Sequence, residues 1–233
     1  MNMSRWPLLL ALILPGTACA GVSAMYEFTS RTAGDNRPAR SATRHFTTEI
    51  DGARFRIHSG RGTLETSVDD GASTFFGPHP ETAQSPLLPG AEGFAAPISA
   101  SIEDESVSIG PPAAGPALFG MATQVYRVEL RYVTVAHIAG VFTRRFRTHA
   151  QYTITVAGGA ASPAAMRVVL SRGYGSALAR HAEALPGLPL RIEAHLDGSD
   201  EDAHGTPHHQ VTDFTVHARS LAPWSWPESA APR

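Results

Sequence analysis

The densest group of residues that could do chemistry lies in the acidic segment 197–209. Imidazole and carboxylate side chains are common ligands of Zn²⁺ and related divalent ions. The group consists of His204, His208 and His209 beside Asp197, Asp200, Glu201 and Asp202. No His-Glu-x-x-His motif is present, and Gly205 and Pro207 interrupt the segment, so we expect a loop without preorganised ligands. A metal-assisted hydrolase centred on these three histidines is therefore an alternative function only.

Other catalytic chemistries have little support in the composition. All 19 basic residues are Arg, so no lysine is available for a Schiff base, a phosphate loop or a serine nucleophile. The single Cys19 cannot form an intramolecular disulfide or a Cys-x-x-Cys redox pair. No Gly-x-Ser-x-Gly nucleophile turn and no glycine-rich phosphate loop are present. We expect a non-catalytic protein that needs no cofactor, and the net charge of -2 argues against nucleic-acid binding.

The first twenty residues are typical of an export signal. A single charge at Arg5 precedes an apolar run from Trp6 to Pro15, which is too short to span a bilayer. Small residues at Ala18 and Ala20 favour cleavage after Ala20, which places the mature protein in the periplasm or outside the cell. Acylation of Cys19 as a lipid anchor is the alternative. No later stretch is long and apolar enough for a transmembrane span, so none is expected.

Alternation with a period of two residues predicts antiparallel hairpins. One hairpin pairs 125–135 with 146–156 around Gly140, and a second pairs 44–50 with 53–58 across the turn dipeptide Asp51-Gly52. A third pairs 64–68 with 73–76. The segment 77–120 is rich in Pro, Gly, Ala and Ser, which indicates a loop-rich insertion with short strands at 98–102 and 106–109.

Further along the chain, one short helix is predicted near residues 174–185, where apolar residues recur at helical spacing before Pro186-Gly187. Strands at 190–196 and 211–219 follow, with the acidic loop between them. The fold class is therefore mainly β (α+β): a single antiparallel, strongly curved sheet or half-barrel with one short helix. It forms one domain over residues 21–228, followed by a disordered tail at 229–233.

Alternation also predicts which side chains share the apolar face of the sheet. Such a face must either pack solid or enclose an apolar ligand. The candidate ligand-binding residues are Phe46, Ile50, Phe55, Ile57, Tyr126, Val128, Leu130, Tyr132, Tyr152 and Ile154. The basic run Arg144-Arg145-Phe146-Arg147 fits a water-facing strand surface, with contact to anionic headgroups as the alternative.

The order of several short motifs resembles a known family. The motifs are the Ile-Asp-Gly-Ala-Arg-Phe-Arg-Ile hairpin at 50–57, the Gly-x-x-Thr-x-x-Tyr-x-Val entry at 120–128, Leu-Pro-Gly-Leu-Pro-Leu-Arg at 185–191, and the closing Trp226-Pro227. In this layout the chain resembles uncharacterised periplasmic proteins related to the outer-membrane lipoprotein carriers. The resemblance implies a half-open antiparallel barrel around helices, whose apolar concavity holds acyl chains.

These observations lead to one leading hypothesis and two alternatives. The leading hypothesis is an exported, non-catalytic binding or assembly module that holds a lipid, or the acyl chain of an acylated protein, by burial of apolar surface. The first alternative is the metal-assisted hydrolase. The second is a structural envelope protein with a solid core and a protein partner.

Overall fold

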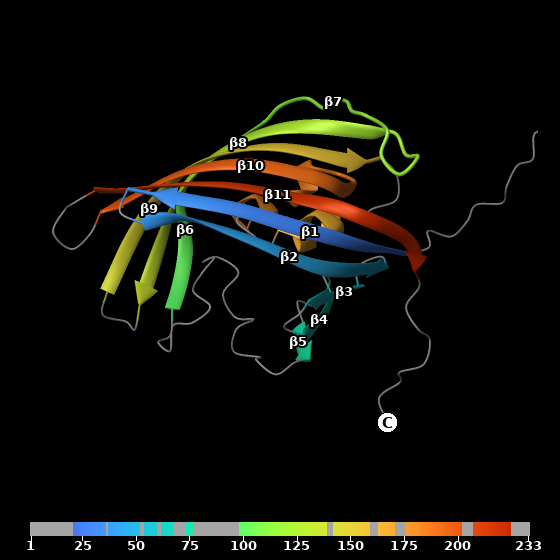
Figure 1. The fold of residues 1–233 in the computed structure, drawn as a ribbon, viewed down its shortest axis with the longest axis horizontal. Helices are drawn as coiled ribbons and strands as arrows, with labels where there is room; N and C mark the ends of the chain where they lie inside the picture. Colours follow the sequence, from blue (N-terminus) through green and yellow to red (C-terminus); the bar gives the residue numbers. More distant parts are fainter. Residues whose placement is uncertain are drawn as a thin grey trace, which may run out of the picture.

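The computed structural model describes residues 21–35, 37–51, 54–59, 62–67, 73–76, 98–138, 142–158, 163–170, 176–201 and 207–224. The expected signal peptide with Cys19, residues 77–97 of the expected loop-rich insertion, and the tail 229–233 lie outside these ranges. The described residues fold into one antiparallel sheet of eleven strands and a few helical turns (Figure 1).

The strands follow one another across the sheet in a simple order, β5-β4-β3-β2-β1-β11-β10-β9-β8-β6. The short β7 also pairs with β8, at a part of β8 that β6 does not reach. Their bounds are β1 Gly21–Gly34, β2 Arg37–Asp51, β3 Arg54–Ser59, β4 Gly62–Ser67, β5 Ser73–Phe76, β6 Ile98–Ile109, β7 Ala113–Ala114, β8 Thr123–Ile138, β9 Phe142–Ala157, β10 Leu188–Glu201 and β11 Pro207–Trp224. Most neighbours are consecutive in sequence, while β1 joins the two halves of the chain by pairing with both β2 and β11.

The three predicted hairpins are confirmed. At the end of the β8–β9 hairpin, Ile138 pairs with Phe142. The β2–β3 hairpin ends with the pair Asp51 and Arg54. In the β4–β5 hairpin, Thr66 pairs with Ser73. The alternation that predicted them follows from strand geometry, because successive side chains point to opposite faces.

Several predicted boundaries were wrong. The segment from Asp197 to Glu201 belongs to β10, and His208 and His209 belong to β11, so the acidic loop is shorter than expected. The two short strands expected within 98–109 form the single strand β6, which is interrupted by an irregularity between Glu103 and Ser106. At this irregularity Asp104 has a positive φ of 48°.

The prediction of one helix near 174–185 was also wrong in detail. That region contains the short α2 at Ser176–Ala179 and a 3-10 turn, η2, at Ala182–Ala184. A further helix, α1 at Pro163–Leu170, was not predicted. Pro163 stands at its first position, where a missing backbone N–H costs nothing.

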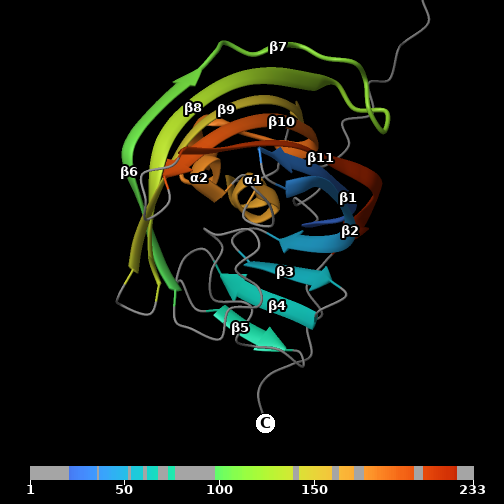
Figure 2. The same ribbon diagram turned by 60° about the vertical axis from the view of Figure 1, so that its left-hand side comes forward.

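Both helices lie on the same side of the sheet, and the ribbon of the sheet passes over them (Figure 2). Within the described residues, strand pairing ends at β5 on one side and at β6 on the other. The structure is therefore an open sheet with a helical layer, and the strong curl expected from the sequence is not part of it.

Candidate functional site

The ten predicted apolar residues share one face of the sheet, and this is the face that carries the helices. Phe55 and Tyr132 are partly buried and pack against the core, and the other eight are buried. We call this surface the apolar face, defined by Phe46, Ile50, Phe55, Ile57, Tyr126, Val128, Leu130, Tyr132, Tyr152 and Ile154. The structure also adds β1 to it, through Ala24, Tyr26 and Phe28.

The helical layer covers the middle of this face. Helix α1 contacts β2 and β10 and also packs against α2 and η2. Its core residues include Met166 and Leu170, and those of the following turns include Leu178 and Leu185, all of which are fully or almost fully buried. Burial of an apolar side chain of this size contributes about 1.5–3 kcal/mol, so these contacts hold the layer in place.

The layer is small compared with the face. Helix α1 has eight residues and α2 has four, which gives lengths of about 12 Å and 6 Å. Strands β8 and β9 have sixteen residues each, or about 50 Å. At the β6 side, Val107 pairs with the buried Leu130 and so belongs to the same face, yet it is 36% exposed. Among the described residues the helices therefore leave apolar surface near β6 open.

Tyrosine hydroxyls are the main polar groups within this face. The hydroxyl of Tyr26 donates a hydrogen bond to the carbonyl oxygen of Pro189 at 2.8 Å, and its ring stacks on Phe46 with centroids 5.2 Å apart. Burial raises the pKa values of Tyr26, Tyr132 and Tyr152 above the ordinary value for tyrosine. All three side chains therefore remain neutral at physiological pH.

A charged contact connects the helical layer to β6. Glu105 lies within the irregularity of this strand and has a mostly buried side chain. Its Oε1 is 2.8 Å from His181 Nε2, and its Oε2 is 3.0 Å from Arg180 Nη1. Both partners lie in the turn that follows α2, so one carboxylate fixes the end of the helical layer to this part of the sheet.

Replacing Glu105 with Gln is expected to loosen this attachment while leaving the sheet intact. Because the ion pair is partly exposed, we expect a loss of about 1 kcal/mol in the free energy of unfolding and faster amide exchange over 176–185. The control is Glu103→Gln, which removes the 2.9 Å contact to Arg145 on the sheet itself. Equal exchange over 176–185 in both variants would show that Glu105 does not hold the helices.

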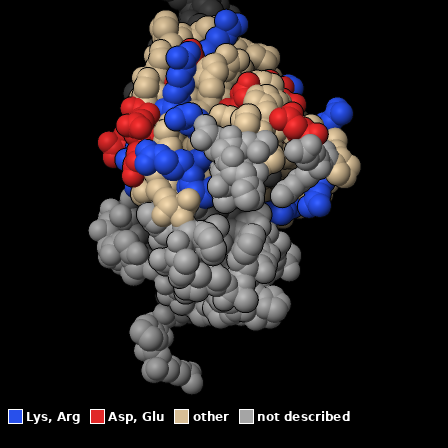
Figure 3. All heavy atoms as spheres, turned by 90° about the vertical axis from the view of Figure 1, so that its left-hand side faces the viewer, with Lys and Arg blue, Asp and Glu red and all other residues tan. Residues whose placement is uncertain are grey.

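The apolar face becomes polar where the strands extend beyond the helices, at the end formed by the β1–β2 and β10–β11 hairpins. On the same side as the buried residues, β1 continues with Thr32 and β11 with Thr212, whose hydroxyls are 3.0 Å apart. On β9, Arg144 ion-pairs with Asp200 and lies over the Phe146 ring, 5.2 Å from its centroid. A view of this end shows Arg side chains gathered with carboxylates (Figure 3).

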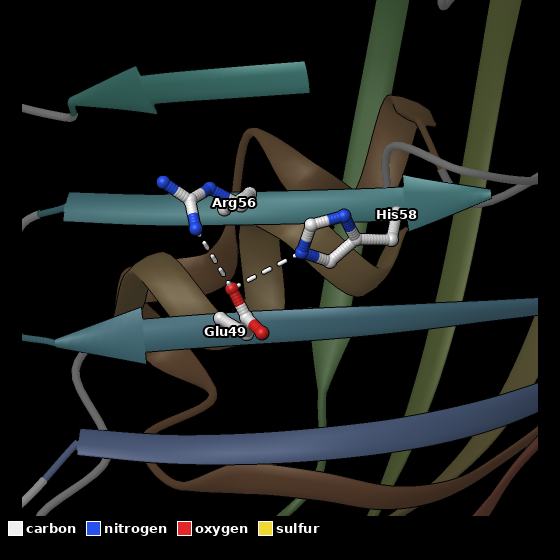
Figure 4. Close-up of polar contacts among 3 residues, drawn as sticks. All are labelled: Glu49, Arg56 and His58. Atoms are coloured by element: carbon white, nitrogen blue, oxygen red, sulfur yellow. Dashed lines mark hydrogen bonds and ion pairs between the residues drawn. The ribbon is translucent and has the colours of Figure 1, made fainter. Parts of the chain in front are cut away.

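The opposite face of the sheet carries paired charges. Glu49 on β2 accepts contacts from two residues of β3, His58 Nε2 at 3.1 Å and Arg56 Nη1 at 3.5 Å (Figure 4). His195 Nδ1 lies 2.7 Å from Asp213 Oδ1 on the neighbouring strand. The His195–Asp213 pair is exposed, and such pairs stabilise a protein by about 0–1 kcal/mol, as expected of a water-facing surface.

Hydrogen bonds from arginine and histidine shift the pKa values of two carboxylates on this face. The hydrogen bond from Arg131, followed by that from His149, lowers the pKa of Glu129. The hydrogen bond from Arg219 similarly lowers the pKa of Glu27, while desolvation lowers that of His217. A shallow open groove of about 680 Å³ crosses the face over β8, β9, β10 and β11. Arg127, Gln151 and Thr215 are among its polar lining residues.

The predicted metal ligands are not brought together in the part of the chain that the structure describes. Asp197 Oδ1 contacts His209 Nε2 at 2.6 Å, which is an ion pair between β10 and β11. His208 precedes His209 in the same strand and so points to the other face. His204 lies outside the described residues, and within those residues no three His, Cys, Asp or Glu side chains are arranged to hold a metal ion.

The comparisons with known proteins found likeness among solved structures. No protein-family model and no curated protein matches the chain. The chain is similar to a LolA superfamily protein. That crystal structure, from Nitrosomonas europaea, matches over 88% of each chain with 10% sequence identity and a TM-score of 0.19. At this TM-score the likeness is too distant to carry a function, so we base the proposal below on contacts within this chain. In the described ranges, no helix has the length and apolarity needed to cross a membrane.

Proposed function

We propose that this protein is an exported, non-catalytic binding module that holds an acyl chain between the apolar face and the helical layer. In this proposal the acyl chain enters from the β6 side, near Val107, and lies along the apolar face of the open sheet. The ligand is a lipid or the acyl group of an acylated protein. The likeness to a LolA superfamily protein agrees with this proposal without establishing it.

The observation that carries the proposal is the mismatch between the two layers. At the β6 edge of the apolar face Val107 is 36% exposed, and in the described part of the chain the two helices opposite the face have eight and four residues. A solid core needs a cover that matches the face it buries. A ligand can instead bury the apolar surface that the helices leave open.

The energy of such binding would come from desolvation. Each methylene removed from water contributes on the order of 0.8 kcal/mol, so a chain of about ten methylenes gains about 8 kcal/mol in total. Displacement of helix contacts and the loss of ligand freedom offset part of this gain. Since about 8 kcal/mol corresponds to a Kd of about 1 μM before these costs, a single acyl chain should bind more weakly than that without polar recognition.

The test uses Val107→Asp, which places a carboxylate on the exposed rim of the apolar face. Binding is measured as displacement of the neutral dye Nile red by dodecanol. Because an acyl chain would have to desolvate the new charge, we expect dodecanol affinity to fall at least about tenfold.

The matched control for this test is Ser106→Asp. Ser106 lies on the same strand and pairs with Arg131 on the water-facing side. The Ser106→Asp variant should bind dodecanol with the same affinity as the unmodified protein. Thermal unfolding should show that both variants are folded. Equal affinity in the two variants, or no dodecanol binding to the unmodified protein, would contradict the proposal and favour a solid core.

A further inference from the structure

One face of strand β2 changes from apolar to positively charged along its length. Its buried residues Phe46 and Ile50 belong to the apolar face, and the same side of the strand continues toward its start with Arg44, Ala42 and Arg40. Both arginines are exposed, and Ala42 is half-buried. Arg44 lies two residues from Phe46, or about 7 Å along the strand, so cationic surface begins where apolar surface ends.

The neighbouring strand β1 shapes the surface beside these arginines. Arg44 pairs with the buried Phe28, Ala42 with Ser30, and Arg40 with Thr32. The two arginine Cα atoms are about 13 Å apart along β2. The small side chains of Ala42 and Ser30 lie between them and leave space over which two guanidinium groups can converge. Phe28 contacts Phe214 at this border, with ring centroids 5.7 Å apart.

Two arginines of β9 at this end have carboxylate partners. Arg144 pairs with Asp200, and Arg145 with Glu103. For Arg40, in contrast, no carboxylate partner is found within the described ranges. Arg144 and Arg145 of the basic run are therefore paired with carboxylates, while β2 contributes cationic charge next to the apolar face.

We propose that Arg40 and Arg44 bind the anionic headgroup of an amphiphile whose acyl chain lies on the apolar face. This inference rests on the proposed function and adds the chemical class of the ligand. Guanidinium groups bind phosphate and carboxylate through paired N–H donors, which gives both charge and orientation. A ligand with an anionic headgroup and a single acyl chain fits the change from apolar to cationic surface along β2. Its tail would lie beside Phe46 and its headgroup over Ala42.

The experiment compares two ligands with the same twelve-carbon chain, dodecyl phosphate and dodecanol, by Nile red displacement. The variant is the double substitution Arg40→Gln and Arg44→Gln. The control is Arg31→Gln, since Arg31 is exposed at the same end but lies on the opposite face of β1. Inorganic phosphate is tested separately as a competitor of dodecyl phosphate.

We expect the double variant to bind dodecyl phosphate about tenfold more weakly, with unchanged dodecanol affinity, because a partly exposed ion pair contributes a few-fold per arginine. Arg31→Gln should change neither affinity. The headgroup site is refuted if dodecyl phosphate and dodecanol bind equally to the unmodified protein. It is also refuted if the ratio of the two affinities is the same in the double variant as in the unmodified protein. In both cases the acyl-chain site stands. Displacement of dodecyl phosphate by submillimolar inorganic phosphate would also refute it, since the site would then recognise the free ion. If neither ligand binds, the proposed function itself fails.

Discussion

Replacing Leu130 with Asp should abolish both folding and ligand binding. Leu130 is fully buried at the centre of the apolar face, next to Val107 of β6 and Ala150 of β9. A carboxylate at this position would lose its hydration without gaining a partner, and the leucine contacts would be lost as well. We expect a loss of more than about 4 kcal/mol in the free energy of unfolding, which is a large part of the stability of a typical domain.

Chemical denaturation followed by circular dichroism measures this effect. The control is Arg127→Asp, because Arg127 lies three positions away on the same strand, is exposed and faces water. We expect that control to change the free energy of unfolding by less than about 1 kcal/mol. A Leu130→Asp protein that folded and bound dodecanol normally would mean that the apolar face is wrongly assigned.

Stability is expected to fall steeply at alkaline pH. Burial raises the pKa values of Tyr26, Tyr132 and Tyr152, so these tyrosines lose their protons in the unfolded chain before they do so in the folded protein. Their contribution is fully present below about pH 10, the ordinary tyrosine pKa, and is lost as the pH rises above it. Each tyrosine that stays protonated in the folded protein lowers the free energy of unfolding by up to about 1.4 kcal/mol per pH unit, and burial makes Tyr26 and Tyr152 the main contributors.

The composition makes this effect easy to isolate. The chain has no lysine and arginine stays protonated, so apart from Cys19 tyrosine is the residue type that titrates between about pH 9.5 and 12. Denaturant titrations across this range give the slope directly. Tyr152→Phe should reduce this slope. Between about pH 7 and 9, where Tyr152 is protonated in both the folded and the unfolded chain, the substitution should not change how stability depends on pH. A slope that is unchanged in Tyr152→Phe would contradict burial of its hydroxyl in a neutral form.

The sequence predicted the hairpins and the apolar face because these depend on strong local patterns. In β8, bulky apolar residues such as Tyr126 and Leu130 alternate with charged residues such as Arg127. The same pattern identified the buried side of β9. Whether the face binds a ligand does not follow from alternation, because a solid core and a cavity wall require the same apolar residues.

The missed elements lack such patterns. In β1 the inward residues after Phe28 are Ser30 and Thr32, and Ala24 is small, so the alternation covers few positions. The ends of β10 and β11 are polar on both faces because they extend past the core, where backbone pairing continues without apolar contacts. Helix α1 is a short segment with a continuous apolar run at its end, for which periodicity does not distinguish a helix from a strand.

Among the residues of interest in the site, Glu105 and the Arg40–Arg44 pair were also missed. Glu105 is a single acidic residue in a polar stretch, and its partners at 180 and 181 come from a distant part of the chain. Only the tertiary structure brings them together. The arginines of β2 could have been found by continuing the alternation of 44–50 backwards, because Arg40 and Arg44 share the parity of Phe46.

Native mass spectrometry of the exported protein, with organic extraction of whatever copurifies, tests the central claim most directly. We predict a complex with one amphiphile per chain, whose extracted component has an acyl chain, and loss of this component in Val107→Asp but not in Ser106→Asp. A ligand-free mass for the unmodified protein, together with no complex on addition of dodecanol, would contradict the claim and identify the apolar face as a closed core.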